Sequence, residues 1–143
     1  MEARGRAFLE GFPWCDGVLE TYVGNLTVGA VVAVLLARVE TGRSDVDEWL
    51  WVVVGDLPPA YLVTDDAPNP ACALRAYVAL MGEWVEATRA GRPVDDLIPV
   101  LTHGGGQEIS PTGANAAQLH SRLDFLAQQI LRNYDTDLRA CGA

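Results

Sequence analysis

Residues 28–64 decide the fold and read VGAVVAVLLARVETGRSDVDEWLWVVVGDLPPAYLVT. The first twelve of them contain five valines, and this β-branched content favours a strand over a helix of similar length. Asn25 and Thr27 are residue types that cap helices, so a helix at this place stays an alternative. Apolar residues occupy both odd and even positions, which predicts a central strand buried on both faces.

Further strands are expected directly after this one. Residues 49–54 (WLWVVV) end at a Gly-Asp pair, and residues 60–64 follow Leu57-Pro58-Pro59. The two prolines exclude both a helix and interior ladder pairing at that connection. Because the connections are short, neighbouring strands should run antiparallel. We therefore expect an antiparallel sheet of three or four strands, built from residues 28–64.

Two amphipathic helices are expected after the sheet. Asn69 suits a helix N-cap, Pro70 the first helical position, and Gly91 the stop, which predicts a helix over 70–90. A second apolar stripe predicts a helix over 112–134. Strands followed by helices are typical of the α+β class. We expect a single domain, 1–143, with both helices packed on one face of the sheet and an irregular or short helical N-terminal segment, 1–27.

The composition excludes several classes of function. The chain has 19 Asp+Glu, ten arginines and no lysine, and its formal net charge is −9. The missing lysine excludes Schiff-base catalysis and a phosphate-loop lysine. The negative charge argues against binding to nucleic acid phosphates or anionic lipid. The longest apolar run, 26–37, is too short to span a bilayer, so no membrane partner is expected.

The cysteines predict a reducing environment. Cys15, Cys72 and Cys141 are odd in number and widely spaced, without a Cys-x-x-Cys or a zinc spacing. We expect free thiols, a cytoplasmic location, and neither a metal nor a cofactor.

Candidate catalytic residues are few. His120 and Asp124 stand four apart on the second predicted helix, where a carboxylate can orient a histidine as a base or ligand, with His103 as a distant partner. Residues 103–106 (HGGG) resemble an oxyanion loop, but the Gly-x-Ser-x-Gly nucleophile pattern is absent. The aspartate pairs 65–66 and 95–96 lie beside turns or helix starts, where acids are favoured structurally.

The binding candidates lie on one predicted strand. Alternation places Trp49, Trp51 and Val53 on one face, and tryptophan is enriched in binding hot spots. If the helices cover the other face, this one is open to a partner. The alternative is that the N-terminal segment covers it with three aromatic residues, Phe8, Phe12 and Trp14.

Three stretches carry a resemblance: residues 49–63 (WLWVVVGDLPPAYLV), Asn69-Pro70 and residues 94–99 (VDDLIP). Over this middle half the chain resembles small uncharacterised bacterial proteins of about this length. The resemblance implies a bacterial cytosolic origin and a shared fold. It implies no activity, cofactor or catalytic residue.

The sequence favours a non-enzymatic interaction protein that binds another protein or itself around Trp49 and Trp51. The acidic surface suits a basic partner, as in a toxin-neutralising immunity protein, and a homodimer fits equally well. The alternative is a small hydrolase or metal-dependent enzyme that uses His120 and Asp124 with His103.

Overall fold

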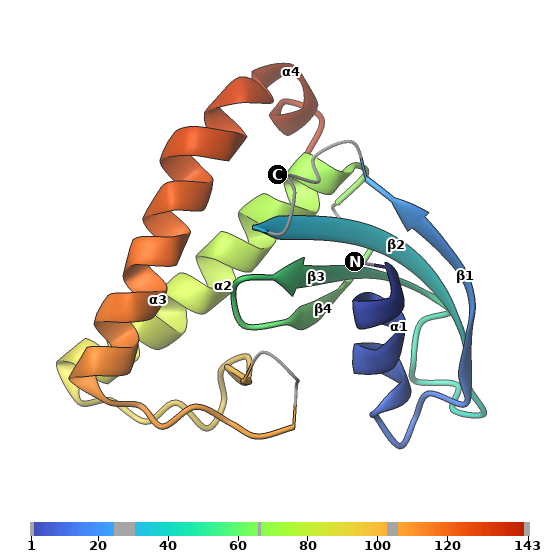
Figure 1. The fold of residues 1–143 in the computed structure, drawn as a ribbon, viewed down its shortest axis with the longest axis horizontal. Helices are drawn as coiled ribbons and strands as arrows, with labels where there is room; N and C mark the ends of the chain where they lie inside the picture. Colours follow the sequence, from blue (N-terminus) through green and yellow to red (C-terminus); the bar gives the residue numbers. More distant parts are fainter. Residues whose placement is uncertain (1, 25–30, 66, 103–105, 142–143) are drawn as a thin grey trace.

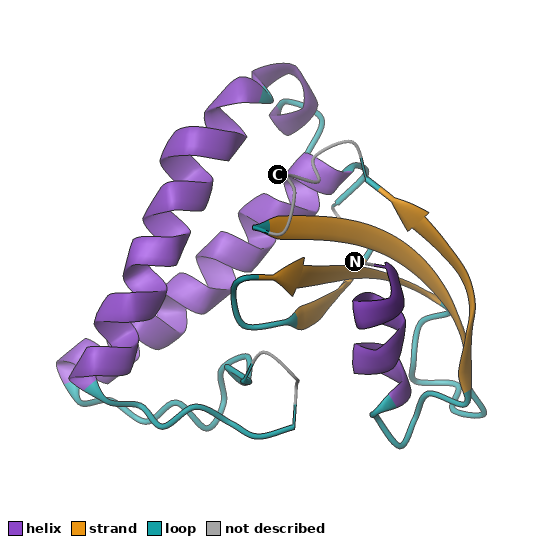
Figure 2. Ribbon diagram, in the orientation of Figure 1, coloured by secondary structure: helices purple, strands orange, loops and turns teal. Residues whose placement is uncertain are grey.

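The computed structural model describes residues 2–24, 31–65, 67–102 and 106–141. These residues form a four-stranded antiparallel sheet in the order β1-β2-β3-β4, with helices on both of its faces (Figure 1). The strands are β1 (Gly17–Val23), β2 (Val32–Glu40), β3 (Trp49–Gly55) and β4 (Ala60–Val63). The expected α+β class with an antiparallel sheet is confirmed: the strands precede the two long helices in the chain, and Figure 2 distinguishes the strands from the helices by colour.

The N-terminal segment is more regular than the sequence indicated. Residues Glu2–Glu10 form helix α1, and the fourth strand, β1, comes from Gly17–Val23. The expectation that the strands are confined to 28–64 is therefore wrong. Residues 25–30, with the alternative helix caps Asn25 and Thr27, lie outside the described residues. β2 is a strand buried along most of its length between β1 and β3, as its apolar pattern predicts.

Helix α2 (Pro70–Ala90) has the predicted bounds because its caps are strong. The Asn69 side chain accepts a hydrogen bond from the backbone N–H of Cys72, at 2.9 Å, and Pro70 takes the first helical position. At the other end Gly91 has φ 71°, the left-handed conformation that favours glycine. Local capping chemistry therefore explains where this helix begins and ends.

The second predicted helix is α3 (Gly113–Phe125), which begins after the N-cap Thr112. It continues through a π-helical turn, η1 (Leu126–Ile130), and a 3-10 turn, η2 (Leu131–Asn133), into the short α4 (Asp135–Leu138). The prediction of one helix over 112–134 is thus correct in extent, while its last eight residues depart from α-helical geometry. α3 packs mainly against α2, and α2 lies on the sheet.

Each face of the sheet contributes to its own hydrophobic core. The larger core joins Val32, Val34, Trp51 and Val53 to the buried stripes of α2 and α3. The smaller core joins the opposite faces of the same strands to α1, at Phe8 and Leu9. The sheet is therefore the middle of three layers, and only its margins remain available as surface.

Candidate functional site

The predicted binding residues are mostly buried. Trp51 is 6% exposed and Val53 is 0% exposed, both within the core under α2. The indole N–H of Trp51 donates to the carbonyl oxygen of Ala67, at 2.9 Å, so its polar group is satisfied inside the protein. These two side chains offer no surface to a partner, which corrects the expected interface.

The reason lies in which face the long helices cover. α2 covers the Trp51–Val53 face, whereas the N-terminal helix α1 covers the opposite face, which carries Leu50, Val52 and Val54. The sequence had instead indicated that the long helices cover the face with Leu50, Val52 and Val54. Both faces are apolar, so alternation separated them correctly without showing which one meets α2.

Trp49 alone of the three lies at the margin of its face, beyond α2, and is partly exposed. Its ring stacks against Tyr22 of β1 with centroids 6.2 Å apart, and the guanidinium carbon of Arg38 lies 6.0 Å from its ring centroid. Arg38 also pairs with Glu48 at 2.6 Å and with Glu20 at 3.7 Å. The hydrogen bond to Glu48 raises the pKa of Arg38, so the guanidinium stays charged beside the ring.

Strand β1 continues this surface to the edge of the sheet. Its partner is β2 on one side, and no described strand pairs with it on the other. The six large exposed apolar side chains of the described residues include three from β1: Leu19 (49%), Tyr22 (54%) and Val23 (48%). We call these three residues with Trp49 the open edge.

Helix α1 holds β1 in place from the buried side. The Arg6 guanidinium donates to the carbonyl oxygen of Val18, at 2.6 Å, and the Thr21 hydroxyl donates to the Glu2 carboxylate, at 2.9 Å. The pairing register shifts between Val18 and Glu20, which marks a bulge at Leu19. These hydrogen bonds therefore hold β1 against α1 within the single chain.

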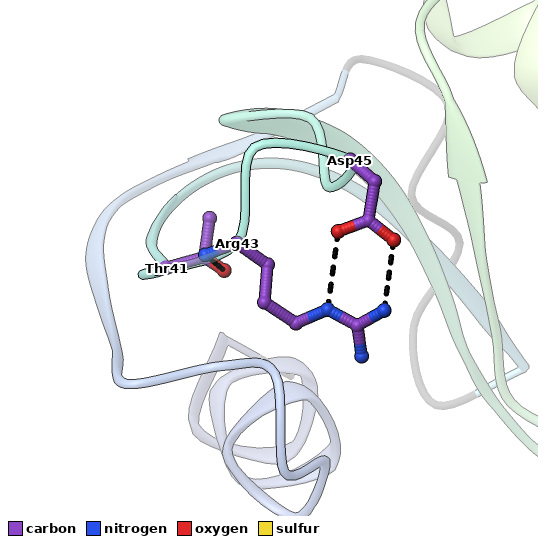
Figure 3. Close-up of polar contacts among 3 residues, drawn as sticks. All are labelled: Thr41, Arg43 and Asp45. Carbon is purple, nitrogen blue, oxygen red and sulfur yellow. Dashed lines mark hydrogen bonds and ion pairs between the residues drawn. The ribbon is translucent and has the colours of Figure 1, made fainter.

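The loop between β2 and β3 borders the open edge and carries a paired charge of its own. Arg43 donates two hydrogen bonds to Asp45, at 3.1 and 2.8 Å, and the backbone N–H of Arg43 donates to the Thr41 hydroxyl (Figure 3). This bidentate contact lowers the pKa of Asp45. Around the open edge the charges of Glu20, Arg38, Arg43, Asp45 and Glu48 are thus all held in ion pairs.

Sequence reasoning missed β1, although a signal was present. Residues 17–23 (GVLETYV) contain two valines, a threonine and a tyrosine, residue types enriched in strands. The mixed apolar spacing of the preceding segment, which forms α1 and its turn, obscured this pattern.

His120 and Asp124, the catalytic candidates that the structure describes, lie on the exposed side of α3. The Nε2 atom of His120 lies 3.6 Å from Oδ2 of Asp124, and the two side chains are 47% and 64% exposed. His103 lies outside the described residues, as does Asp66. Among the described residues there is no group of three or more His, Cys, Asp or Glu side chains placed to hold a metal ion. The observed pair is what neighbouring charges four apart on an exposed helix form by themselves.

The cysteines contradict the expectation of free thiols. Cys72, at the start of α2, is bonded to Cys141, 69 residues further along the chain. Cys15 is a buried free thiol whose pKa is raised by desolvation, and it donates to the carbonyl oxygen of Gly17. Wide spacing in sequence did not reveal the pair, because the chain returns α4 to the N-terminus of α2.

Comparison with known proteins does not indicate a function for this chain. No helix in the described part of the chain is long and apolar enough to cross a membrane. No protein-family model matches the chain, and comparison with curated proteins and with solved structures finds no significant match. Any functional assignment therefore depends on the geometry above.

Proposed function

We propose that the protein is a non-enzymatic interaction module that associates through the open edge, with a second copy of the chain as its partner there. The observation that carries this proposal is the exposure of Leu19, Tyr22 and Val23 on an edge strand. An edge strand presents unpaired backbone N–H and C=O groups that another strand can pair with. Exposed apolar side chains on the same strand add a favourable area to bury.

The charges around the open edge favour a second copy over a basic partner. Glu20 and Glu48 both pair with Arg38, and Asp45 pairs with Arg43, so three carboxylates share two guanidinium groups and little net charge remains among them. A surface on which these charges are paired within the chain, and which exposes several apolar side chains, is compatible with itself across a two-fold axis. Antiparallel pairing of β1 with β1 of the second copy would join the two sheets into one.

The rest of the notably acidic surface supports a different partner. A net charge of −9 favours encounter with a basic protein, and an immunity-type role is one form of this proposal. The pair of His120 and Asp124 supports no catalytic proposal, because both side chains are largely exposed and no group of three or more His, Cys, Asp or Glu that could hold a metal ion occurs among the described residues.

For the location, the cytoplasm stays our proposal. It requires that the Cys72–Cys141 bond form there or be lost there, since reducing compartments keep most thiols free. Alkylation of the thiols at the moment of cell lysis, followed by mass spectrometry, distinguishes the two states.

The experiment for the open edge compares two lysine substitutions. Val23→Lys places a charge on β1, and Val63→Lys places the same charge on β4, the other edge of the sheet, where the side chain is similarly exposed (48% and 51%). Sedimentation equilibrium of the wild type should show a mass that rises with concentration toward twice that of the monomer. Val23→Lys should weaken this association at least ten-fold, whereas Val63→Lys should leave it unchanged.

Two results would contradict the proposal. One is a wild-type protein that stays monomeric over the whole concentration range. The other is equal weakening by both lysine variants, which would show a general effect of charge and no role for β1.

A further inference from the structure

A groove runs along the connection between α2 and α3. Three adjoining pockets form it, with volumes of about 110, 290 and 190 Å³. Trp84, Val100 and Ile109 line both of the first two, and Ile98 and Pro99 line both of the last two. Because they share these lining residues, the three pockets lie next to one another, and we call them together the groove; no residue of the open edge lines them.

At one end is a pocket that we call the aromatic pocket, and none of the described residues that line it is charged. Phe8, Phe12 and Tyr61 form one side, and Ile98 and Pro99 form the other. The ring centroids of Phe12 and Tyr61 lie 5.1 Å apart, and Trp14 supports Tyr61 from behind at 5.0 Å. Interlocked rings lose little conformational freedom on binding, so the pocket is prepared for one apolar or prolyl side chain.

The middle pocket, which we call the acidic pocket, adds charge next to this anchor site. Asp95 and Glu108 line it, both are exposed, and neither forms an ion pair or side-chain hydrogen bond with another described residue. Neither the acidic nor the aromatic pocket is lined by an arginine. Arg122 lines only the third pocket, where it pairs with Asp56 at 2.8 Å.

We propose that this groove binds an extended peptide segment of a basic partner protein. An apolar or prolyl side chain of the peptide occupies the aromatic pocket, and a neighbouring Arg or Lys pairs with Asp95 and Glu108. Charge complementarity selects this occupant, because Asp95 and Glu108 are exposed carboxylates for which the described residues provide no paired cation, so they attract a cationic side chain. An extended segment suits a shallow groove because its side chains reach neighbouring pockets separately.

The groove is a site for the basic partner of the proposed function, and binding there does not depend on the open edge. The two surfaces have no residue in common, so either can fail while the other holds.

The test is selection of a random peptide library, displayed on phage, against the full-length protein. The selected peptides should carry an Arg or Lys next to an apolar or prolyl residue. Fluorescently labelled copies of these peptides then measure affinity by polarisation. The double variant Asp95→Asn/Glu108→Gln should bind them roughly five-fold more weakly, the effect of losing two exposed ion pairs, and added salt should weaken the wild type similarly.

A matched control removes two charges elsewhere. Glu83→Gln/Glu86→Gln makes the same change in net charge on the exposed side of α2, outside the groove, and should leave the affinity unchanged. Ile98→Ser alters the wall shared by the aromatic and acidic pockets and should weaken binding at least ten-fold. Phe125→Ser, at a side chain 41% exposed on α3, is its control. Val23→Lys should bind the peptides normally, which separates the groove from the open edge.

Each failure has a distinct reading. Recovery of no binding peptide, or of acidic peptides, overturns the proposal. So does equal weakening by the groove pair and by the α2 pair. If Ile98→Ser does not fold, the double charge variant decides alone, because its substitutions are exposed and nearly isosteric.

Discussion

Breaking the bond between Cys72 and Cys141 should cost about 4 kcal/mol of unfolding free energy. The bond closes a loop with a sequence separation of 69 residues. In the chain-entropy description, a cross-link over a loop of that length removes about 15 cal/mol/K from the unfolded chain, or about 4 kcal/mol at room temperature. Domains of this kind are stable by about 5–15 kcal/mol in total, so the change is large and corresponds to roughly 13 °C in melting temperature.

The preferred perturbation is Cys141→Ser. Cys141 is partly exposed, so serine there leaves no cavity, whereas Cys72 is 3% exposed and its replacement would also disturb the core. Urea unfolding of the wild type with and without reductant, and of Cys141→Ser, should give one value for the reduced protein and the variant. Cys15→Ala is the control, since that buried thiol has no disulfide partner and alanine adds no polar group to the core; reduction should still lower its unfolding free energy by about 4 kcal/mol.

Two observations would refute the reasoning. If the native, unreduced protein offers all three thiols to a thiol reagent after denaturation, the bond is not formed. If it is formed but reduction changes the unfolding free energy by less than about 1 kcal/mol, the loop is not free in the unfolded state and the entropic argument fails.

Two further substitutions test the framework around α2. Tyr77 is fully buried and its hydroxyl donates to the carbonyl oxygen of Pro58 at 2.6 Å, while desolvation raises the pKa of the phenol above its ordinary value. Because the pKa of Tyr77 is higher in the folded than in the unfolded chain, the stability that depends on the neutral phenol is fully present below about pH 10 and is lost as pH rises further. Phenylalanine cannot ionise, so alkaline unfolding of Tyr77→Phe, followed by circular dichroism, should begin at a higher pH than that of the wild type. Asn69→Ala removes both the cap bond to Cys72 and the 2.9 Å bond from the Asn69 amide to the carbonyl oxygen of Asp137, and should cost about 1–2 kcal/mol in urea unfolding. Asn69→Asp keeps the cap acceptor and should recover most of that loss; equal loss in both variants would contradict the capping explanation.

Local chemistry explains which parts of the fold the sequence predicts well. The bounds of α2 depend on Asn69, Pro70 and Gly91, which act on the backbone within one or two turns. The strand identity of β2 follows from its β-branched content, and its central place follows from apolar residues on both faces. Neither prediction needs knowledge of distant parts of the chain.

Long-range pairing explains what the sequence did not predict. Trp51 and Leu50 are equally suitable for burial, so alternation cannot say which one meets α2 and which meets α1. The cysteine pair has the same origin, because 69 residues separate two atoms that only the path of α3 and α4 brings together. The binding residues were predicted least well, because the exposure of a strand depends on which elements pack against it.

Binding at the two proposed surfaces should respond differently to ionic strength, because the charges of the two surfaces differ. At the open edge, the charges of Arg38 and Arg43 are already paired within the chain, so association there depends on apolar burial and should change little with salt. At the groove, Asp95 and Glu108 have no cation among the described residues, so a bound peptide supplies the only one and salt should weaken its binding. A protein that self-associates at the edge would therefore remain a dimer in salt that releases its basic partner. One salt titration, followed for mass and for peptide polarisation in the same samples, separates the two surfaces: parallel loss of both signals would show that a single electrostatic contact carries both.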